Sequence, residues 1–520
     1  MTPQQKFIYP LVAAILVIIG VVLGYNLHPK IDAKRASKLE EVLSALEEKY
    51  VDNVNKDSLF DNAINEMLRK LDPHSRYISK EDLINEQGEI NGKFGGVGIQ
   101  FQLINDTICV IDAMRNGPAY IAGLRSGDQI IEVRGKKFTG KEITNDKIME
   151  ALKGEINTSV LVTVIRKNEK TIVNIKRGEI KVEAVDTYFM IDQKTGFIKI
   201  NQFSVPSHAE FCNAAKYLLS KGMKSLVLDL RGNPGGVMDA AVAISDEFLP
   251  QGDVIVSVRG KAFQSKTEYA KSGGLLERVA LSILIDENSA SAAEIVAAAI
   301  QDNDRGILVG RRTFGKGLVQ QDQILSDGSS VRMTVSRYYT PSGRTIQRAY
   351  NGDYFSYISH SSRFQMGELL HADSIPIDKT KAYKTKKGRT VYGGGGVVPD
   401  VFVPYDTSMS SPVLSLLFTQ QTFSAYVFKM LQTNRNKWPS PMSLIKYDFT
   451  KNEWVSFENY AEKHLQIQDV SRLLRMERKR MNMILKTEYA RQLWHNAIYV
   501  RYMLGEDNEI NAARNRLNAN

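Results

Sequence analysis

The stretch VALSILIDENSASAAEIVAAAIQD, residues 279–302, joins an apolar run to a run rich in alanine. Residues 279–285 have the length and composition of a buried strand, and the segment from Ser291 onward is predicted to be a helix. A strand that feeds a helix is the repeating unit of an α/β fold. Two serines, Ser289 and Ser291, stand at the junction. A serine there can cap the helix, or it can be a nucleophile whose developing oxyanion the helix N-terminus stabilises.

The segments on either side repeat this alternation of strand and helix. Buried or half-buried strands and helices with helical periodicity follow one another along the chain, at residues 196–203, 208–222, 225–232, 238–249 and 306–310. The pattern predicts an α/β core with a partly parallel sheet over residues 179–405. Within it, residues 351–390 are polar and predicted to form a loop-like insertion, and GGVVPDV at 395–401 returns to the core.

Other parts of the chain have a different character, and 520 residues exceed what one compact core holds. Residues 31–88 show helical periodicity that ends near Pro73. Residues 89–178 are short β-type runs with one helical stretch at 145–152, and residues 406–520 are again helical. The predicted fold class is therefore a multidomain α/β (α+β) protein with small helical, mostly β, α/β and C-terminal helical parts.

The N-terminal segment FIYPLVAAILVIIGVVLGY, residues 7–25, carries no charge. As a helix it would be roughly 28 Å long, close to the thickness of a bilayer core. No Ala-x-Ala cleavage site follows. This favours an uncleaved signal anchor, formed by residues 1–30, over a signal peptide that is removed. Basic residues on both sides leave the orientation undecided.

Composition argues against a nucleic-acid partner. The net charge is +10, but the basic residues are spread along the chain, which is typical of a solvated surface. The two cysteines, Cys109 and Cys212, stand in apolar contexts and are predicted to be buried; a disulfide is compatible with the sequence and not implied by it. The seven histidines form no recognisable triad or metal motif, so no metal site and no cofactor are predicted.

Two glycine-rich turns are candidates for chemistry. DLRGNPGG, residues 229–236, follows a buried strand, and its backbone N–H groups could form an oxyanion hole, although a plain strand-to-helix turn is equally compatible. In GRRTFGKGLVQQ, residues 310–321, Lys316 is flanked by two glycines. A lysine held against other backbone loses solvation, which lowers the pKa of its amine and suits a general base, whereas an exposed hairpin lysine is the commoner case.

With no histidine available, Lys316 is the base that a serine nucleophile here would use, as in Ser–Lys variants of the catalytic triad. SASAAEI (289–295) followed by FGKGLVQ (314–320) resembles the C-terminal processing, or tail-specific, protease family. The resemblance extends from about residue 35 to 405 in the family's order. Its further motifs are residues 50–79, FGGVGIQF (94–101), residues 117–133, DLRGNPGG, YYTPSGRTIQ (338–347) and GGVVPDV.

The resemblance implies a role for individual residues. Ser291, three positions before Glu294, matches the nucleophile, and Ser289 is left as a cap or turn residue. Lys316 matches the general base, and Gln320 the residue that orients the lysine amine; on a strand these two positions share a face. The implied oxyanion hole consists of the N–H of Ala292 and that of Gly235 or Gly236, and the choice of glycine stays open.

The resemblance also implies that residues 89–178 are a PDZ domain. Its carboxylate-binding turn would be GGVGI, with the peptide adding as a strand beside it. The residues concerned are Gly95, Gly96, Val97, Gly98 and Ile99. Apolar Val97, Ile99 and Phe101 predict a preference for an apolar last side chain. A PDZ fold that binds an internal segment, or nothing, remains an alternative.

The resulting prediction is a membrane-anchored serine endopeptidase that cuts proteins near apolar C-termini. The anchor and the resemblance together place it in a bacterial inner membrane, with the catalytic part in the periplasm. The insertion and the C-terminal helices are candidates for regulation or for assembly into a homo-oligomer. Two alternatives stay open: an inactive PDZ scaffold or chaperone, and a basic protein that binds anionic surfaces, whose binding would depend steeply on salt.

Overall fold

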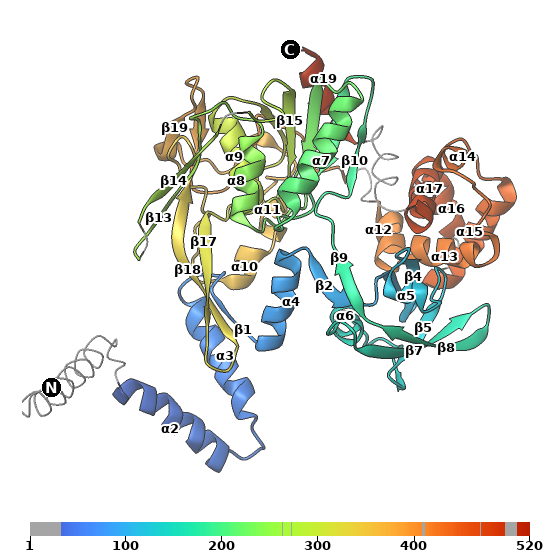
Figure 1. Cartoon of the computed structure of the whole chain (residues 1–520). Coiled ribbons are helices and arrows are strands. Elements are labelled where there is room, and N and C mark those ends of the chain that lie inside the picture. The colour runs from blue at the N-terminus through green and yellow to red at the C-terminus, as the bar shows by residue number, and fades with distance from the viewer. Residues whose placement is uncertain are drawn as a thin grey trace, which may run out of the picture. The chain divides into compact units, whose positions relative to one another are not determined.

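The computed structural model describes residues 33–519 apart from 263, 272, 408–410, 468–469 and 495–506 (Figure 1). The chain divides into two compact units, and the boundary in the sequence lies between Tyr77 and Ile78. The predicted membrane anchor, residues 7–25, lies outside the described residues. Among the residues that are described, no helix combines the length and the hydropathy that crossing a bilayer requires.

The first unit contains the two helices predicted from periodicity, α2 (Ala33–Lys49) and α3 (Lys56–Arg69). Asn55 caps α3, because its side chain accepts a hydrogen bond from the backbone N–H of Ser58. The helical segment expected over residues 31–88 continues into the second unit as α4 (Lys80–Ile90), which Ser79 caps in the same way.

The mostly β module is present as predicted, and its helix α6 (Asn145–Leu152) has the predicted bounds. A small ladder pairs β2 (Lys93–Gly96) with β9 (Gly178–Lys181). The main sheet has the order β3-β4-β5-β7-β8, so that β3 lies at an edge. Its strands are β3 (Ile99–Ile104), β4 (Thr107–Ala113), β5 (Gln129–Val133), β7 (Ser159–Arg166) and β8 (Glu169–Lys176).

The α/β core is built on a six-stranded sheet of order β10-β11-β12-β15-β16-β21. Only the β10–β11 pair is antiparallel; the other neighbours are parallel, as the alternating pattern predicted. The strands are β10 (Thr187–Met190), β11 (Thr195–Lys199), β12 (Ser225–Asp229), β15 (Ala280–Ile285), β16 (Ile307–Gly310) and β21 (Val401–Phe402).

Both faces of this sheet are covered. Leu226 and Leu228 of β12 pack into the large core formed with α7 (Ser207–Ser220), α8 (Met238–Asp246) and α9 (Ala292–Asp302). Val227, between them, points to the other face because side chains alternate along a strand. There it packs with Ile510 and Ala513 of α19 (Asn508–Ala519), the last helix of the chain.

A second sheet contains the strands that follow the lysine candidate. β17 (Leu318–Ile324) and β18 (Ser330–Tyr339) form a hairpin, with a bulge between Val319 and Gln320. β18 also pairs with β13 (Val254–Gly260), which in turn pairs with β14 (Lys266–Tyr269).

Residues 351–390, predicted to be a polar loop or excursion from the core, contain regular secondary structure. The segment contains helices α10 (Tyr354–Ile358) and α11 (Ser361–Gln365) and a hairpin of β19 (Ala382–Lys384) and β20 (Thr390–Tyr392). Arg363 of α11 and Arg312 of the core share Glu368, and all three side chains are buried. Paired charges therefore replace the apolar residues by which a packed segment is usually recognised.

The C-terminal region is helical as predicted, but it divides between two places. Helices from α12 (Pro412–Thr419) to α17 (Arg478–Trp494) share an aromatic-rich core. Ala425 and Phe428 of α13 (Thr422–Asn434) pack on Ile104, Cys109 and Ile111 of the β module. Helix α19 instead belongs to the α/β core. Both cysteines are buried, as predicted, and they do not form the disulfide that the sequence left open. Burial raises the pKa of the Cys109 thiol to about 12.

Candidate active site

Three loops meet at one edge of the central sheet, because parallel strands end on the same side. β12 ends at Asp229 and leads into the DLRGNPGG turn, β15 ends at Ile285 before the two serines, and β16 ends at Gly310 before Lys316. The sheet thus brings together residues that lie up to about 90 positions apart in the sequence.

Ser291 is the N-cap residue of α9, and its backbone is unusual. Its φ of 54° and ψ of −113° are values that side chains other than glycine rarely adopt. Such strain persists only when the surroundings hold it, and it is often found at functional sites. Here the N–H of Ser291 donates to Glu294 Oε2 at 2.8 Å. The N-cap residue of α9 and the candidate nucleophile are therefore the same residue, and Ser289, left as a cap or turn residue, does not cap this helix.

Ser289 has a different role. It is fully buried. Its Oγ accepts a hydrogen bond from the N–H of Asp286 at 2.9 Å and donates one to the carbonyl oxygen of Leu230 at 2.8 Å. These bonds tie the turn after β15 to the end of β12. Ser289 is thus a structural turn residue, as the sequence predicted.

Glu294 connects the serine to the lysine segment. Its carboxylate, fully buried, accepts the N–H groups of Ser291, Gly315 and Lys316, each at 2.8 Å, and the hydroxyl of Thr313 at 2.5 Å. Burial raises the pKa of this carboxyl, while the four donors act in the opposite direction. One side chain therefore fixes the N-terminus of α9 and the loop that carries Lys316.

Tyr338 of β18 provides a second connection between the same two residues. Its buried hydroxyl lies 2.7 Å from the carbonyl oxygen of Lys316 and 3.2 Å from that of Ser291, and it donates to them. Burial and the nearby charge of Glu294 raise the pKa of Tyr338, so the phenol keeps its proton and stays a donor. Glu294 thus accepts hydrogen bonds from the N–H groups of Ser291 and Lys316, and Tyr338 donates to the carbonyl groups of the same two residues.

The Lys316 side chain donates to Gln320 Oε1 at 3.0 Å, so the predicted pair is formed. The pair does not arise from regular alternation along one strand. Lys316 precedes β17, and a bulge shifts the strand register between Val319 and Gln320. The two flanking glycines do mark close backbone contacts. A Cβ on Gly315 would lie 3.0 Å from the nitrogen of Gly396, and one on Gly317 would lie 3.0 Å from that of Gln347.

The glycine turn lies beside the serine. A Cβ on Gly235 would be 2.7 Å from the Cβ of Ser291, and both Gly235 and Gly236 have positive φ angles, of 100° and 136°. The N–H of Gly235 donates to the side-chain oxygen of buried Asn233 at 2.8 Å. No acceptor among the described residues takes the N–H of Gly236 or of Ala292. This geometry favours Gly236 over Gly235 as an oxyanion donor.

The five candidate carboxylate-binding residues of the β module separate into two groups. Gly95 and Gly96 belong to β2 and pair with β9. Val97 and Gly98, the latter with φ 74°, form the turn into the edge strand β3, which Ile99 begins. The carbonyls of Val97 and Gly98 accept the N–H groups of Ala119 and Met114. The edge strand β3 therefore begins at the turn, which is the arrangement that strand addition uses.

Sequence reasoning missed three residues of the site: Asn233, Thr313 and Tyr338. Thr313 and Tyr338 act through hydrogen bonds to residues of other segments, Glu294 and Lys316. Asn233 accepts the N–H of Gly235 within its own turn and donates to the carbonyl oxygen of Ile200. All three lie inside the motifs named above, but no local pattern reveals that their polar atoms face the site. Glu294 was noticed only for its position relative to Ser291.

Comparison with known proteins followed the same division of the chain. Residues 194–353 match the model of peptidase family S41, residues 95–176 that of the PDZ domain, and residues 26–82 that of the activating protease CtpB N-terminal domain. A "Probable CtpA-like serine protease" of Staphylococcus aureus is 35% identical over 356 residues, covering 66% of this chain and 70% of the relative.

A "Carboxy-terminal-processing protease" of Bartonella bacilliformis is 35% identical over 321 residues, covering 60% of this chain and 73% of the relative. Among solved structures, the photosystem II D1 C-terminal processing protease is 24% identical, with a TM-score of 0.37, and the match covers 70% of this chain and 92% of that one.

Proposed function

The chain belongs to peptidase family S41, the C-terminal processing serine proteases with a PDZ domain, and on this basis we propose that Ser291 is its nucleophile and Lys316 its general base. The observation that carries the proposal is the attachment of both residues to one carboxylate oxygen of Glu294. One buried side chain thus holds together two residues that lie 25 positions apart in the sequence.

In the proposed reaction, neutral Lys316 takes the proton from the Ser291 hydroxyl as its oxygen attacks the scissile carbonyl. The N–H groups of Gly236 and Ala292 stabilise the oxyanion. The protonated lysine then donates its proton to the leaving amine, and an acyl-enzyme remains. Water, deprotonated by the same lysine, hydrolyses the ester and frees the enzyme. The hydrogen bond of Lys316 Nζ to Gln320 Oε1 supports Gln320 as a positioning residue for the amine.

We propose that the PDZ domain selects the substrate by its free C-terminus. Val97, Gly98 and Ile99 supply the turn for the terminal carboxylate, and β3 supplies an edge along which the peptide adds as a strand. Val97, Ile99 and Phe101 border the apolar core of this domain, which supports a preference for an apolar last side chain. The α/β protease core then cleaves the substrate upstream of the bound C-terminus.

We further propose that residues 7–25 anchor the protein in the inner membrane of a bacterial cell envelope, with the protease core on the periplasmic side. The uncharged run of 19 residues supports this proposal. Fractionation of cells that express the full chain and the chain lacking residues 1–30 tests it. Release of the full chain by a high-salt or alkaline wash would contradict an integral anchor.

A cleavage assay tests the catalytic proposal. The chain lacking residues 1–30 is incubated with peptides that end in apolar residues, beside Ser291→Ala, Lys316→Ala and Lys316→Arg. Arginine keeps the charge but cannot lose a proton, so it should be as inactive as alanine. Ser289→Ala, with its secondary structure verified, is the matched control. Cleavage by Ser291→Ala would reject the assignment, and no cleavage by any form would favour a non-catalytic scaffold.

A further inference from the structure

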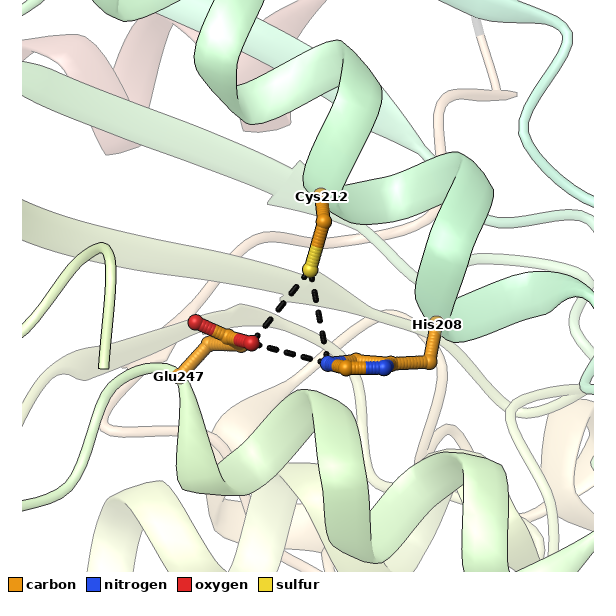
Figure 2. Close-up of side chains that lie close together, drawn as sticks. All are labelled: His208, Cys212 and Glu247. Carbon is orange, nitrogen blue, oxygen red and sulfur yellow. Dashed lines mark hydrogen bonds and ion pairs between the residues drawn. The ribbon is translucent and has the colours of Figure 1, made fainter. Parts of the chain in front are cut away.

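Three side chains with metal-binding atoms meet between two helices of the protease core (Figure 2). His208 lies in the first turn of α7, Cys212 follows one helical turn later on the same face, and Glu247 directly follows α8. Among the described residues, this is the one group in which three such side chains bring their ligand atoms within 4.8 Å of one another.

The distances between these atoms resemble those of a metal site. Cys212 Sγ lies 3.3 Å from His208 Nε2 and 3.3 Å from Glu247 Oε1, while His208 Nε2 and Glu247 Oε1 are 2.8 Å apart. Ligand bonds of about 2.0–2.3 Å in tetrahedral zinc sites place neighbouring ligand atoms roughly 3.3–3.7 Å apart. The two sulfur distances fit, and the histidine–glutamate pair would have to open by about half an ångström.

A backbone hydrogen bond from outside the group already orients the Glu247 carboxylate. Glu247 Oε2 accepts the N–H of Leu275 at 2.8 Å, which leaves Oε1 facing the cysteine and the histidine. Hydrogen bonds of this kind, which orient a ligand from outside the site, are typical of metal sites. The Cys212 side chain is buried, but 39% of the His208 side chain is exposed, so an ion can reach the group from solvent.

We propose that His208, Cys212 and Glu247 bind one zinc ion, or a similar transition-metal ion, with water as the fourth ligand. A set of one sulfur, one nitrogen and one oxygen selects ions of intermediate softness and disfavours Mg²⁺ and Ca²⁺, which require oxygen ligands. The site is separate from the proposed Ser291–Lys316 chemistry, so it does not depend on that assignment. The competing explanation is an ion pair of His208 with Glu247 beside a cysteine that packs in the core.

The location suggests a consequence of binding. Phe203, five residues before His208, donates its N–H to the carbonyl of Gly235 and accepts the N–H of Val237. Helix α8, which Glu247 follows, begins directly after this glycine turn. An ion shared by α7 and α8 would therefore cross-link the elements on both sides of the Gly235–Gly236 turn. The expected effect is a higher melting temperature of the metal-loaded protein.

Cobalt binding provides the test, because a thiolate bound to Co²⁺ gives a charge-transfer absorption band that carboxylate and imidazole do not give. The full chain with Ser291→Ala, which prevents self-digestion, is freed of metal with a chelator, reduced and titrated with Co²⁺. The expected result is one equivalent of Co²⁺ with this band, which Zn²⁺ abolishes. No band at millimolar Co²⁺ overturns the proposal.

Variants identify the ligands. Cys212→Ser should lose the band, whereas Cys109→Ser, which removes the other buried cysteine, should keep it. His208→Ala and Glu247→Gln should each weaken binding by at least the roughly 10–100-fold that is typical of losing a residue that merely orients a ligand. A band that survives Cys212→Ser, or unchanged affinity in both other variants, overturns the proposal. Melting curves without metal verify that each variant is folded, and Zn²⁺ should raise the melting temperature of the parent but not of Cys212→Ser.

Discussion

Ser291 and Lys316 donate their backbone N–H groups to the same oxygen of Glu294, each at 2.8 Å. Their nitrogens can therefore be no more than two hydrogen-bond lengths apart, although the residues belong to different loops. The hydroxyl of Tyr338 links the carbonyl groups of the same pair. The serine and the lysine are thus positioned through their backbones, independently of any contact between their side chains. This arrangement predicts that residues which never touch the substrate control the rate.

Replacing Glu294 with glutamine should nearly abolish catalysis. The amide keeps the volume, but its NH₂ group would face donors where the carboxylate oxygen accepted them. We expect the free energy of unfolding to fall by about 2–4 kcal/mol, since buried donors lose their acceptor. We also expect a fall in kcat by at least about 100-fold at little changed KM. Glu169→Gln, on an exposed strand end, is the control. Wild-type kcat in a folded Glu294→Gln protein would contradict this account.

Tyr338→Phe removes a single hydroxyl and keeps the ring. The loss of one buried hydrogen bond should cost about 1 kcal/mol of stability, measured by denaturant unfolding. The kcat should fall, because the carbonyls of Ser291 and Lys316 lose their common donor. The neighbouring Tyr339, whose ring stacks on Arg259, provides the matched control Tyr339→Phe. Equal kcat values for the two variants would remove Tyr338 from the positioning apparatus.

Local signals explain what the sequence predicted correctly. The apolar run at 279–285 and the alanine-rich run after it became β15 and α9 because each is buried over nearly its whole length. Helix α6 is amphipathic instead: it buries Ile148 and Leu152, one helical turn apart, and this periodicity gave its bounds. For the site, the two glycines around Lys316 indicated close backbone contacts, which the structure has at Gly396 and Gln347. In each case the cause lies within a few residues of the effect.

What the sequence did not predict depends on contacts between distant residues. The helices and the hairpin of residues 351–390 have no clear local signal, because the buried residues of this segment include charges. Arg363 and Glu368 are tolerated there because they pair with each other and with Arg312 of the core. Helix α19 offers few apolar residues, and nothing local indicates that Ile510 packs on the central sheet. The His208–Cys212–Glu247 group was not predicted for the same reason, since Glu247 lies 35 positions after Cys212 in the sequence.

The buried pairs of Glu368 predict how stability depends on pH. Burial alone would raise the pKa of Glu368, but Arg312 and Arg363 outweigh it and lower this pKa below its ordinary value. A lowered pKa in the folded state means that the stabilisation is present above the ordinary glutamate pKa of about 4.3 and is lost as the pH falls through the folded value. The melting temperature should therefore drop steeply below about pH 4.5.

Glu368→Gln should reduce that acid dependence and, at neutral pH, destabilise the protein by about 3–5 kcal/mol, since it leaves two buried guanidinium groups without a countercharge. Melting curves from pH 3 to pH 7 on both proteins measure the two effects. Parallel curves would mean that Glu368 does not contribute to the acid dependence. Glu169→Gln, which alters an exposed carboxylate, should give a curve that parallels the wild type.

The C-terminal helix predicts a long-range effect on activity. Glu509 pairs with Arg231 of the glycine turn and with Arg311 of the segment that leads to Lys316. Glu509→Ala should therefore destabilise the protein and lower kcat, because it removes a carboxylate that two arginines beside the proposed active site share. Arg231 keeps its pairs with Asp229 and Asp507, and Arg311 keeps its pair with Glu287. Arg516→Ala, at an exposed position of the same helix, should leave both unchanged. A variant that is destabilised but has the wild-type kcat would restrict α19 to a structural role.

The edge strand β3 predicts that the protease distinguishes a free from an amidated C-terminus. Amidation removes the charge that the turn of Val97 and Gly98 would bind, and it changes neither the scissile bond nor the protein. Peptide pairs that differ only in this group should show a higher KM for the amide, and a charged last residue should have a similar effect. If the PDZ domain merely tethers the substrate, kcat stays constant. If occupation of the domain activates the core, kcat falls as well, because the binding energy that favours the active arrangement of the loops is lost. Equal kcat/KM values for the free and amidated peptides would show that the carboxylate is not recognised.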